Sequence, residues 1–171
     1  TTVTLVGRIL QAAGKRVFVG GNIGQPLIGR LGEIGPSDSV VMELSSFQLE
    51  GFGPATPPER AFPEGAWSPM GAAILNVTPN HLDRHPSMEA YIEAKANILR
   101  YQQPGSWSVL NRDDPVTRAL RERCVGRVLE FSLMERVPVG AYLDGDRIVW
   151  ASEAGDIRQV CSVSQIRLRG R

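Results

Sequence analysis

The chain has 171 residues, of which 42% are hydrophobic and 22% are charged, and its formal net charge is +1. This composition fits one globular domain with a sizeable core and excludes a disordered or fibrous chain. The balanced charge gives no general attraction to nucleic acid or anionic lipid, so we expect neither as a partner. No stretch reaches the roughly 20 apolar residues that span a bilayer, which predicts a cytoplasmic protein without membrane insertion.

Helices and strands alternate along the first 127 residues. Apolar positions from Leu5 to Ala13 repeat with a helical period up to Gly14, which suits the left-handed conformation after a helix end. Two further helices are predicted over residues 87–101 and 114–124. Short apolar strands are predicted at residues 17–19, 40–44, 72–77 and 107–111. This alternation predicts an α/β fold with a mainly parallel sheet flanked by helices.

The pattern changes after about residue 128 to short strands with tight turns, at residues 128–131, 141–143, 147–151 and 157–168. The dipeptide Asp144-Gly145 favours a hairpin, because glycine accepts the positive φ angles of a tight turn. We therefore assign residues 1–127 to a parallel α/β core and residues 128–171 to a small antiparallel β subdomain. A Gly- and Pro-rich segment, residues 51–70, is predicted to be an inserted surface loop.

Polar clusters follow three of the predicted strands. They are Gly20-Gly-Asn-Ile-Gly24, Glu43-Leu-Ser-Ser-Phe-Gln48 and Asn76-Val-Thr-Pro-Asn-His-Leu-Asp-Arg84. Ligands of parallel sheets gather at the carboxyl ends of the strands, where helix N-termini offer backbone N–H groups. The clusters therefore predict a site at this edge. A fourth segment, Asn111-Arg-Asp-Asp114, is better explained as the cap and first turn of the next helix.

Three residues in these regions have both a structural and a functional interpretation. Glu43 ends an apolar strand, and its carboxylate either reaches solvent or binds a hard cation such as Mg²⁺. His81 is either a surface residue or a ligand. Lys95 lies four residues after Tyr91 on the apolar side of its helix; its ammonium either extends to the edge, or is desolvated and open to chemical modification.

The glycine-rich cluster is either a tight turn or a phosphate loop. The cysteines, Cys124 and Cys161, lack metal-ligand spacing and are predicted to be core thiols.

Taken in order, the three strand-end clusters and Ala94-Lys95 resemble the central domain of the Mur ligases, and within that family the branch that adds D-glutamate. The resemblance runs from Thr1 to Arg171 and is interrupted mainly by residues 51–70. It implies a P-loop-like ATPase domain of a ligase in peptidoglycan synthesis, which uses ATP and two Mg²⁺ ions to join D-glutamate to UDP-N-acetylmuramoyl-L-alanine through an acyl phosphate. A monomer is expected.

The resemblance also implies roles for individual residues. Glu43 would hold the Mg²⁺ that bridges the ATP phosphates, and His81 would bind the second. Lys95 would be a carbamylated lysine that serves this metal site, so Lys95 and His81 would be the catalytic residues. Asn22 and Ser45 would lie near the muramoyl substrate, with Asn22 also near the phosphates.

The family's phosphate loop ends just before the helix that opens this chain. Thr1 would match its last threonine, so we expect a fragment cut at both ends, without the N- and C-terminal domains of the full enzyme and inactive alone. The alternatives are a sibling Mur ligase, a folylpolyglutamate synthetase-type ligase or a non-catalytic nucleotide-binding module.

Overall fold

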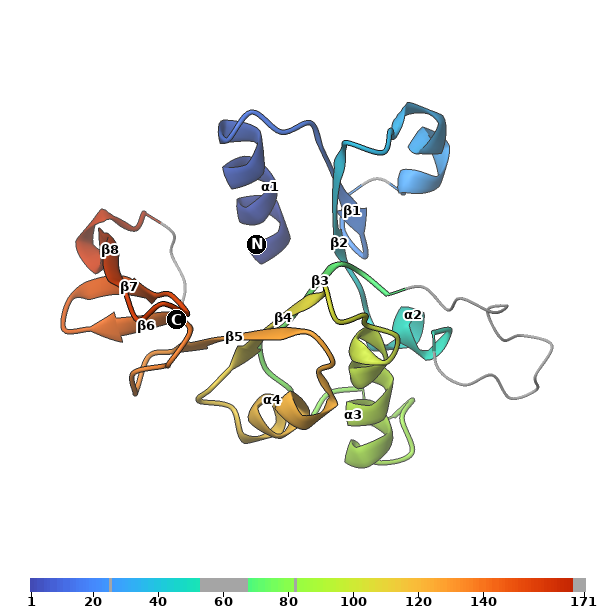
Figure 1. Cartoon of the computed structure of the whole chain (residues 1–171). Helices are drawn as coiled ribbons and strands as arrows, with labels where there is room; N and C mark the ends of the chain where they lie inside the picture. The colour runs from blue at the N-terminus through green and yellow to red at the C-terminus, as the bar shows by residue number, and fades with distance from the viewer. Residues whose placement is uncertain (25, 53–67, 82, 168–171) are drawn as a thin grey trace. The chain divides into compact units, whose positions relative to one another are not determined.

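The computed structural model describes residues 1–24, 26–52, 68–81 and 83–167. The chain divides into two compact units, Thr1–Leu49 and Glu50–Arg171, and each unit has its own β-sheet (Figure 1). Most of the surface loop predicted over residues 51–70 lies outside the described residues. In the part that is described, no helix is long and apolar enough to cross a membrane.

The first unit begins with α1 (Thr2–Ala12), which ends where the sequence predicts. Gly14 takes a φ of +77°, and its amide donates to the carbonyl of Gln11 at 2.9 Å. The amide of Lys15 donates to the carbonyl of Leu10 at 3.0 Å, which completes a left-handed helix end. Helix α1 lies close to the sheet at Gly7, where a Cβ would come within 2.5 Å of a Val19 methyl group.

Two parallel strands form the sheet of this unit, β1 (Val17–Gly21) and β2 (Ser39–Glu43). They are connected through the 3₁₀ helix η1 (Leu27–Glu33), and α2 (Ser46–Glu50) follows β2. The register pairs Gly21 with Glu43, so the glycine-rich cluster and the Glu43 cluster leave the sheet at the same edge.

The second unit contains a six-stranded sheet in the order β3-β4-β5-β6-β7-β8. The strands are β3 (Gly71–Ile74), β4 (Trp107–Asn111), β5 (Arg127–Ser132), β6 (Gly140–Asp144), β7 (Arg147–Ala151) and β8 (Ile157–Ser162). The first four strands are parallel and the last two add antiparallel pairs. This arrangement confirms the predicted fold class.

The start of the antiparallel region differs from the expectation. The strand predicted at residues 128–131 is β5, and it pairs parallel with β4 because a helical crossover returns the chain in the same direction. Antiparallel pairing begins only with the β6–β7 hairpin, whose turn residue Gly145 takes a φ of +63°. The division of the chain at residue 127 stays a prediction.

The last predicted strand is also shorter than expected. Strand β8 ends at Ser162, where the side chains of Ser162 and Gln165 each accept a hydrogen bond from the other's backbone amide. This capping box starts a 3₁₀ turn, η5 (Val163–Gln165), so the extended pattern cannot continue.

Two helices cover one face of the strands β3 to β5 (Figure 1). Helix α3 (Met88–Ala96) begins at Ser87, whose hydroxyl accepts from the amide of Ala90, and it continues into η3 (Asn97–Leu99). Helix α4 (Pro115–Ala119) begins at Asp114, as predicted, and continues into η4 (Leu120–Arg123). The core that they share with the sheet contains Ala72, Ile74, Val77, Tyr91, Ala96, Leu99, Leu110 and Leu120, with Cys124 packed against it.

An ion pair between Glu93 and Arg123 connects α3 to η4. The guanidinium donates to both carboxylate oxygens, with Nη1 at 2.8 Å from Oε2. The hydrogen bonds from Arg123 are the main cause that holds the pKa of Glu93 below its ordinary value of 4.5. The stabilisation is therefore complete above that pH and is lost as the pH falls through the lower pKa of the folded state.

We expect Glu93→Gln to lower the free energy of unfolding by about 0.5 kcal/mol at neutral pH, because the pair is half exposed. Urea unfolding of both proteins at several pH values measures the difference, which should shrink as the pH falls below 4.5. Glu122→Gln, an exposed change in η4, is the control. A difference that stays constant down to acidic pH would contradict the ion pair.

Candidate functional site

The edge of the first sheet carries the glycine-rich cluster and Glu43 in direct contact. Gly21 has a φ of +97°, and a Cβ there would come within 2.1 Å of the Glu43 carbonyl oxygen, so only glycine fits. The amide of Asn22 donates to that same carbonyl at 2.6 Å. The turn therefore folds over the end of β2, with exposed Asn22 beside half-buried Glu43. One carboxylate suits Mg²⁺, which takes its other ligands from phosphate and water.

Ser45 has a structural role that the sequence analysis missed. Its amide and hydroxyl both donate to the side-chain oxygen of Gln48, at 2.9 and 3.1 Å, and its hydroxyl accepts from the Gln48 amide at 3.2 Å. This arrangement caps the start of α2, and the Ser-x-x-Gln spacing is its sequence signal. A substrate contact by Ser45 stays a prediction.

Thr1 lies at the N-terminal cap position of α1. Its carbonyl accepts from the amide of Leu5 at 3.0 Å, while its side chain makes no capping hydrogen bond. The N-terminus of an eleven-residue helix presents backbone N–H groups and a partial positive charge, which favour an anion such as phosphate.

His81 occupies a strained position in the loop after β3. Its φ of +54° makes it the single described non-glycine residue with a positive φ. The side chain of Asn80 accepts from the His81 amide at 2.9 Å, and the His81 carbonyl accepts from the amides of Arg84 and His85 at 3.0 and 2.9 Å. Such conformations cost about 1–3 kcal/mol and concentrate at functional sites.

Lys95 is partly buried on α3, on the face that the sequence predicts. Its Nζ lies 5.0 Å from the centroid of the Tyr91 ring, and Tyr91 belongs to the core. The side chain thus lies along a buried aromatic ring, where a cation over the ring face is stabilised.

The predicted site residues fall into two groups. Thr1, Asn22, Glu43 and Ser45 lie in the first unit, whereas His81 and Lys95 lie in the second. Among the described residues, no group of three or more His, Cys, Asp or Glu side chains could hold a metal ion by itself. A metal shared by these groups stays a prediction.

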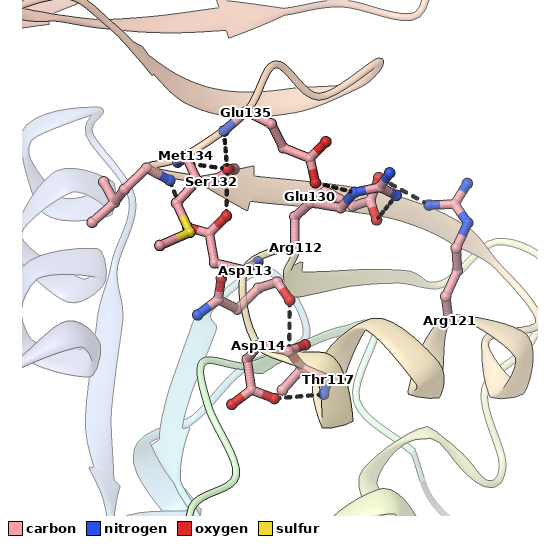
Figure 2. A network of polar contacts seen from close by, with 11 residues as sticks. Arg112, Asp113, Asp114, Thr117, Arg121, Glu130, Ser132, Met134 and Glu135 are labelled. Atoms are coloured by element: carbon pink, nitrogen blue, oxygen red, sulfur yellow. Dashed lines mark hydrogen bonds and ion pairs between the residues drawn. The ribbon is translucent and has the colours of Figure 1, made fainter.

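A dense polar network surrounds the ends of β4 and β5 (Figure 2). The carboxylate of Glu130 is 2% exposed and lies 3.4 Å from Arg112 and 3.3 Å from Arg121. Asp113 accepts from the hydroxyl of Ser132 at 2.5 Å and from the amide of Leu133 at 2.7 Å. The loop after β4 is therefore attached to the loop after β5, and Asp114 alone caps α4.

Replacing Glu130 with glutamine should destabilise the protein by about 2 kcal/mol, because two guanidinium groups lose a buried counter-ion. Thermal or urea unfolding measures the change. Glu135→Gln removes a half-exposed carboxylate from Arg112 and should cost less. Equal effects of the two substitutions would show that burial of Glu130 contributes nothing.

Comparison with known proteins identifies relatives along the whole chain. The family model of the Mur ligase middle domain matches residues 1–166. The chain is 41% identical over 170 residues to the UDP-N-acetylmuramoylalanine–D-glutamate ligase of Clostridium novyi, a match that covers 99% of this chain and 33% of the relative. It is 42% identical over 174 residues to the ligase of that name from Symbiobacterium thermophilum, covering 99% of this chain and 35% of the relative. The chain spans about a third of the length of these relatives.

Solved structures share the fold at lower sequence identity. The crystal structure of MurF from Acinetobacter baumannii matches with a TM-score of 0.58 and 16% identity, over 95% of this chain and 36% of that one. MurF ligase from Thermotoga maritima in complex with ADP matches with a TM-score of 0.56 and 19% identity, over 94% of this chain and 38% of that one. These matches support the fold alone.

Proposed function

We propose a function for this chain, which belongs to the Mur ligase family and matches the middle domain of these ligases. The chain contributes the nucleotide- and metal-handling part of an ATP-dependent ligase that joins D-glutamate to UDP-N-acetylmuramoyl-L-alanine during peptidoglycan synthesis. The observation that carries the proposal is the 41% identity to a D-glutamate ligase over 99% of the chain. We infer a cytoplasmic monomer.

The reaction has two steps. The terminal carboxylate of UDP-N-acetylmuramoyl-L-alanine attacks the γ-phosphorus of ATP, which forms an acyl phosphate and releases ADP. The amino group of D-glutamate then attacks the acyl carbon, phosphate leaves with the bonding electrons, and the amine loses a proton. Both steps depend on alignment of the reactants and on neutralisation of phosphate charge.

The first unit would receive the phosphates. Thr1 and the first amides of α1 offer donors to a phosphate, and exposed Asn22 lies beside Glu43 on the folded turn. The Glu43 carboxylate would hold a Mg²⁺ ion, which would neutralise phosphate charge when bound. Ser45, at the start of α2, would face the muramoyl substrate.

The second unit would act at the acyl phosphate. His81 would provide a ligand for the second Mg²⁺ from its strained loop position. Lys95, once carbamylated, would carry a negative charge and serve the same metal. Carbamylation joins the neutral amine of Lys95 to carbon dioxide and releases a proton.

A domain exchange tests the function. The middle domain of the Clostridium novyi ligase, 41% identical to this chain, can be replaced by residues 1–171. We expect the hybrid to form product with ATP and D-glutamate, and Glu43→Ala to lower kcat by about 10²- to 10³-fold, the usual effect of losing a charge-stabilising group. The control Glu153→Ala, an exposed carboxylate on Arg127, should leave kcat unchanged. A folded hybrid that forms no product would contradict the proposed function.

A second substitution tests Lys95. Lys95→Ala in the hybrid should abolish most activity, and short-chain carboxylates should restore part of it by replacing the carbamate oxygens. Lys15→Ala, which changes the other lysine, should have no effect and gain nothing from added carboxylate. Full activity of Lys95→Ala would exclude the proposed role.

A further inference from the structure

His85 is a buried polar residue without a role in the proposed mechanism. Its side chain is 2% exposed, and its Nδ1 lies 3.3 Å from a carboxylate oxygen of half-exposed Glu50. A buried imidazole is costly without a polar partner, and Glu50 supplies one from the surface. The His85 ring also lies against the Tyr91 ring, with centroids 5.0 Å apart and planes inclined by 52°.

The same residue is in contact with both halves of the proposed acyl-phosphate site. Its amide donates to the His81 carbonyl at 2.9 Å. Its ring partner, Tyr91, also contacts the Lys95 ammonium, whose Nζ is 5.0 Å from the Tyr91 ring centroid. A continuous series of contacts therefore runs from His81 through His85 and Tyr91 to Lys95.

Local geometry makes this connection rigid. His85 precedes Pro86, which restricts its backbone, and Ser87 then caps α3. Tyr91 and Lys95 are four residues apart on that helix and so share a face. The strained backbone of His81 persists only if its surroundings hold it, and the His85 amide is one of the groups that do.

We propose that His85 is a positioning residue, which sets the spacing between His81 and Lys95 through its amide and through the Tyr91 ring. The importance of that spacing rests on the proposed ligase function, whereas the positioning itself does not. Glu50 contacts His85 from the protein surface, and Tyr91 contacts it from the core. Removal of either partner should therefore change the position of Lys95.

The chain offers a direct readout because it has two lysines, Lys15 and Lys95. Reductive dimethylation with ¹³C-formaldehyde labels both lysine amines as well as the N-terminal amine, and preserves their charge. We expect the Lys95 methyl resonance to lie upfield of the Lys15 resonance, because the Tyr91 ring current acts on it. Tyr91→Phe should retain this displacement and Tyr91→Leu should remove it.

The decisive variant is His85→Asn. Loss of most of the Lys95 displacement, with the Lys15 resonance unchanged and a cooperative thermal transition, supports positioning by His85. A folded His85→Asn protein with the wild-type Lys95 resonance overturns the proposal, because a residue that only stabilised the fold would give that result.

Glu50→Ala covers the case in which His85→Asn does not fold, since Glu50 is half exposed. It should reduce the Lys95 displacement in part, while Glu153→Ala should leave it unchanged; an unchanged resonance in Glu50→Ala overturns the proposal.

In the hybrid ligase, His85→Asn should lower kcat more than it raises KM. A hybrid without ligase activity, combined with the expected NMR changes, rejects the proposed function and leaves the positioning role standing.

Discussion

Parallel hydrogen bonding on both sides of β4 is the constraint on which the second unit depends. Strands β3 and β5 run in the same direction as β4, so the loops that follow all three leave the sheet at one edge. Side chains then connect these loops. Asp114 accepts from the amide of Val77 at 3.3 Å, and Asp113 accepts from Ser132 and Leu133. This edge of the sheet is therefore stabilised by hydrogen bonds between loops as well as by the sheet itself.

Local signals predicted much of this fold. The ends and turns of several elements were predicted correctly from the conformational preference of a single nearby residue. Gly14 ends a helix, Ser87 and Asp114 begin helices, and Gly145 forms a hairpin turn. The apolar stripe of α3 placed Lys95 on the partly buried face. These features depend on backbone geometry and short spacings, which a sequence contains directly.

Other features depend on residues that are distant in the chain. The direction of β5 follows from the crossover before it, and Glu130 is tolerated in the sheet because Arg112 and Arg121 reach it from separate segments. The position of His85 between His81 and Tyr91 could not be predicted, because the sequence around a histidine does not show whether its side chain is buried or exposed. The Ser45 cap could have been predicted, since its Ser-x-x-Gln signal lies within four residues.

The left-handed backbone of His81 affects how any substitution there must be interpreted. Alanine removes the imidazole but keeps a Cβ that disfavours a φ of +54°, whereas glycine removes the imidazole and relaxes the loop. Asparagine accepts this conformation best among residues with a polar side chain. Asparagine at position 81 therefore reports the loss of the imidazole with the backbone conformation kept, and the further change to glycine reports the energy stored in the backbone. An alanine scan would combine the two into one number.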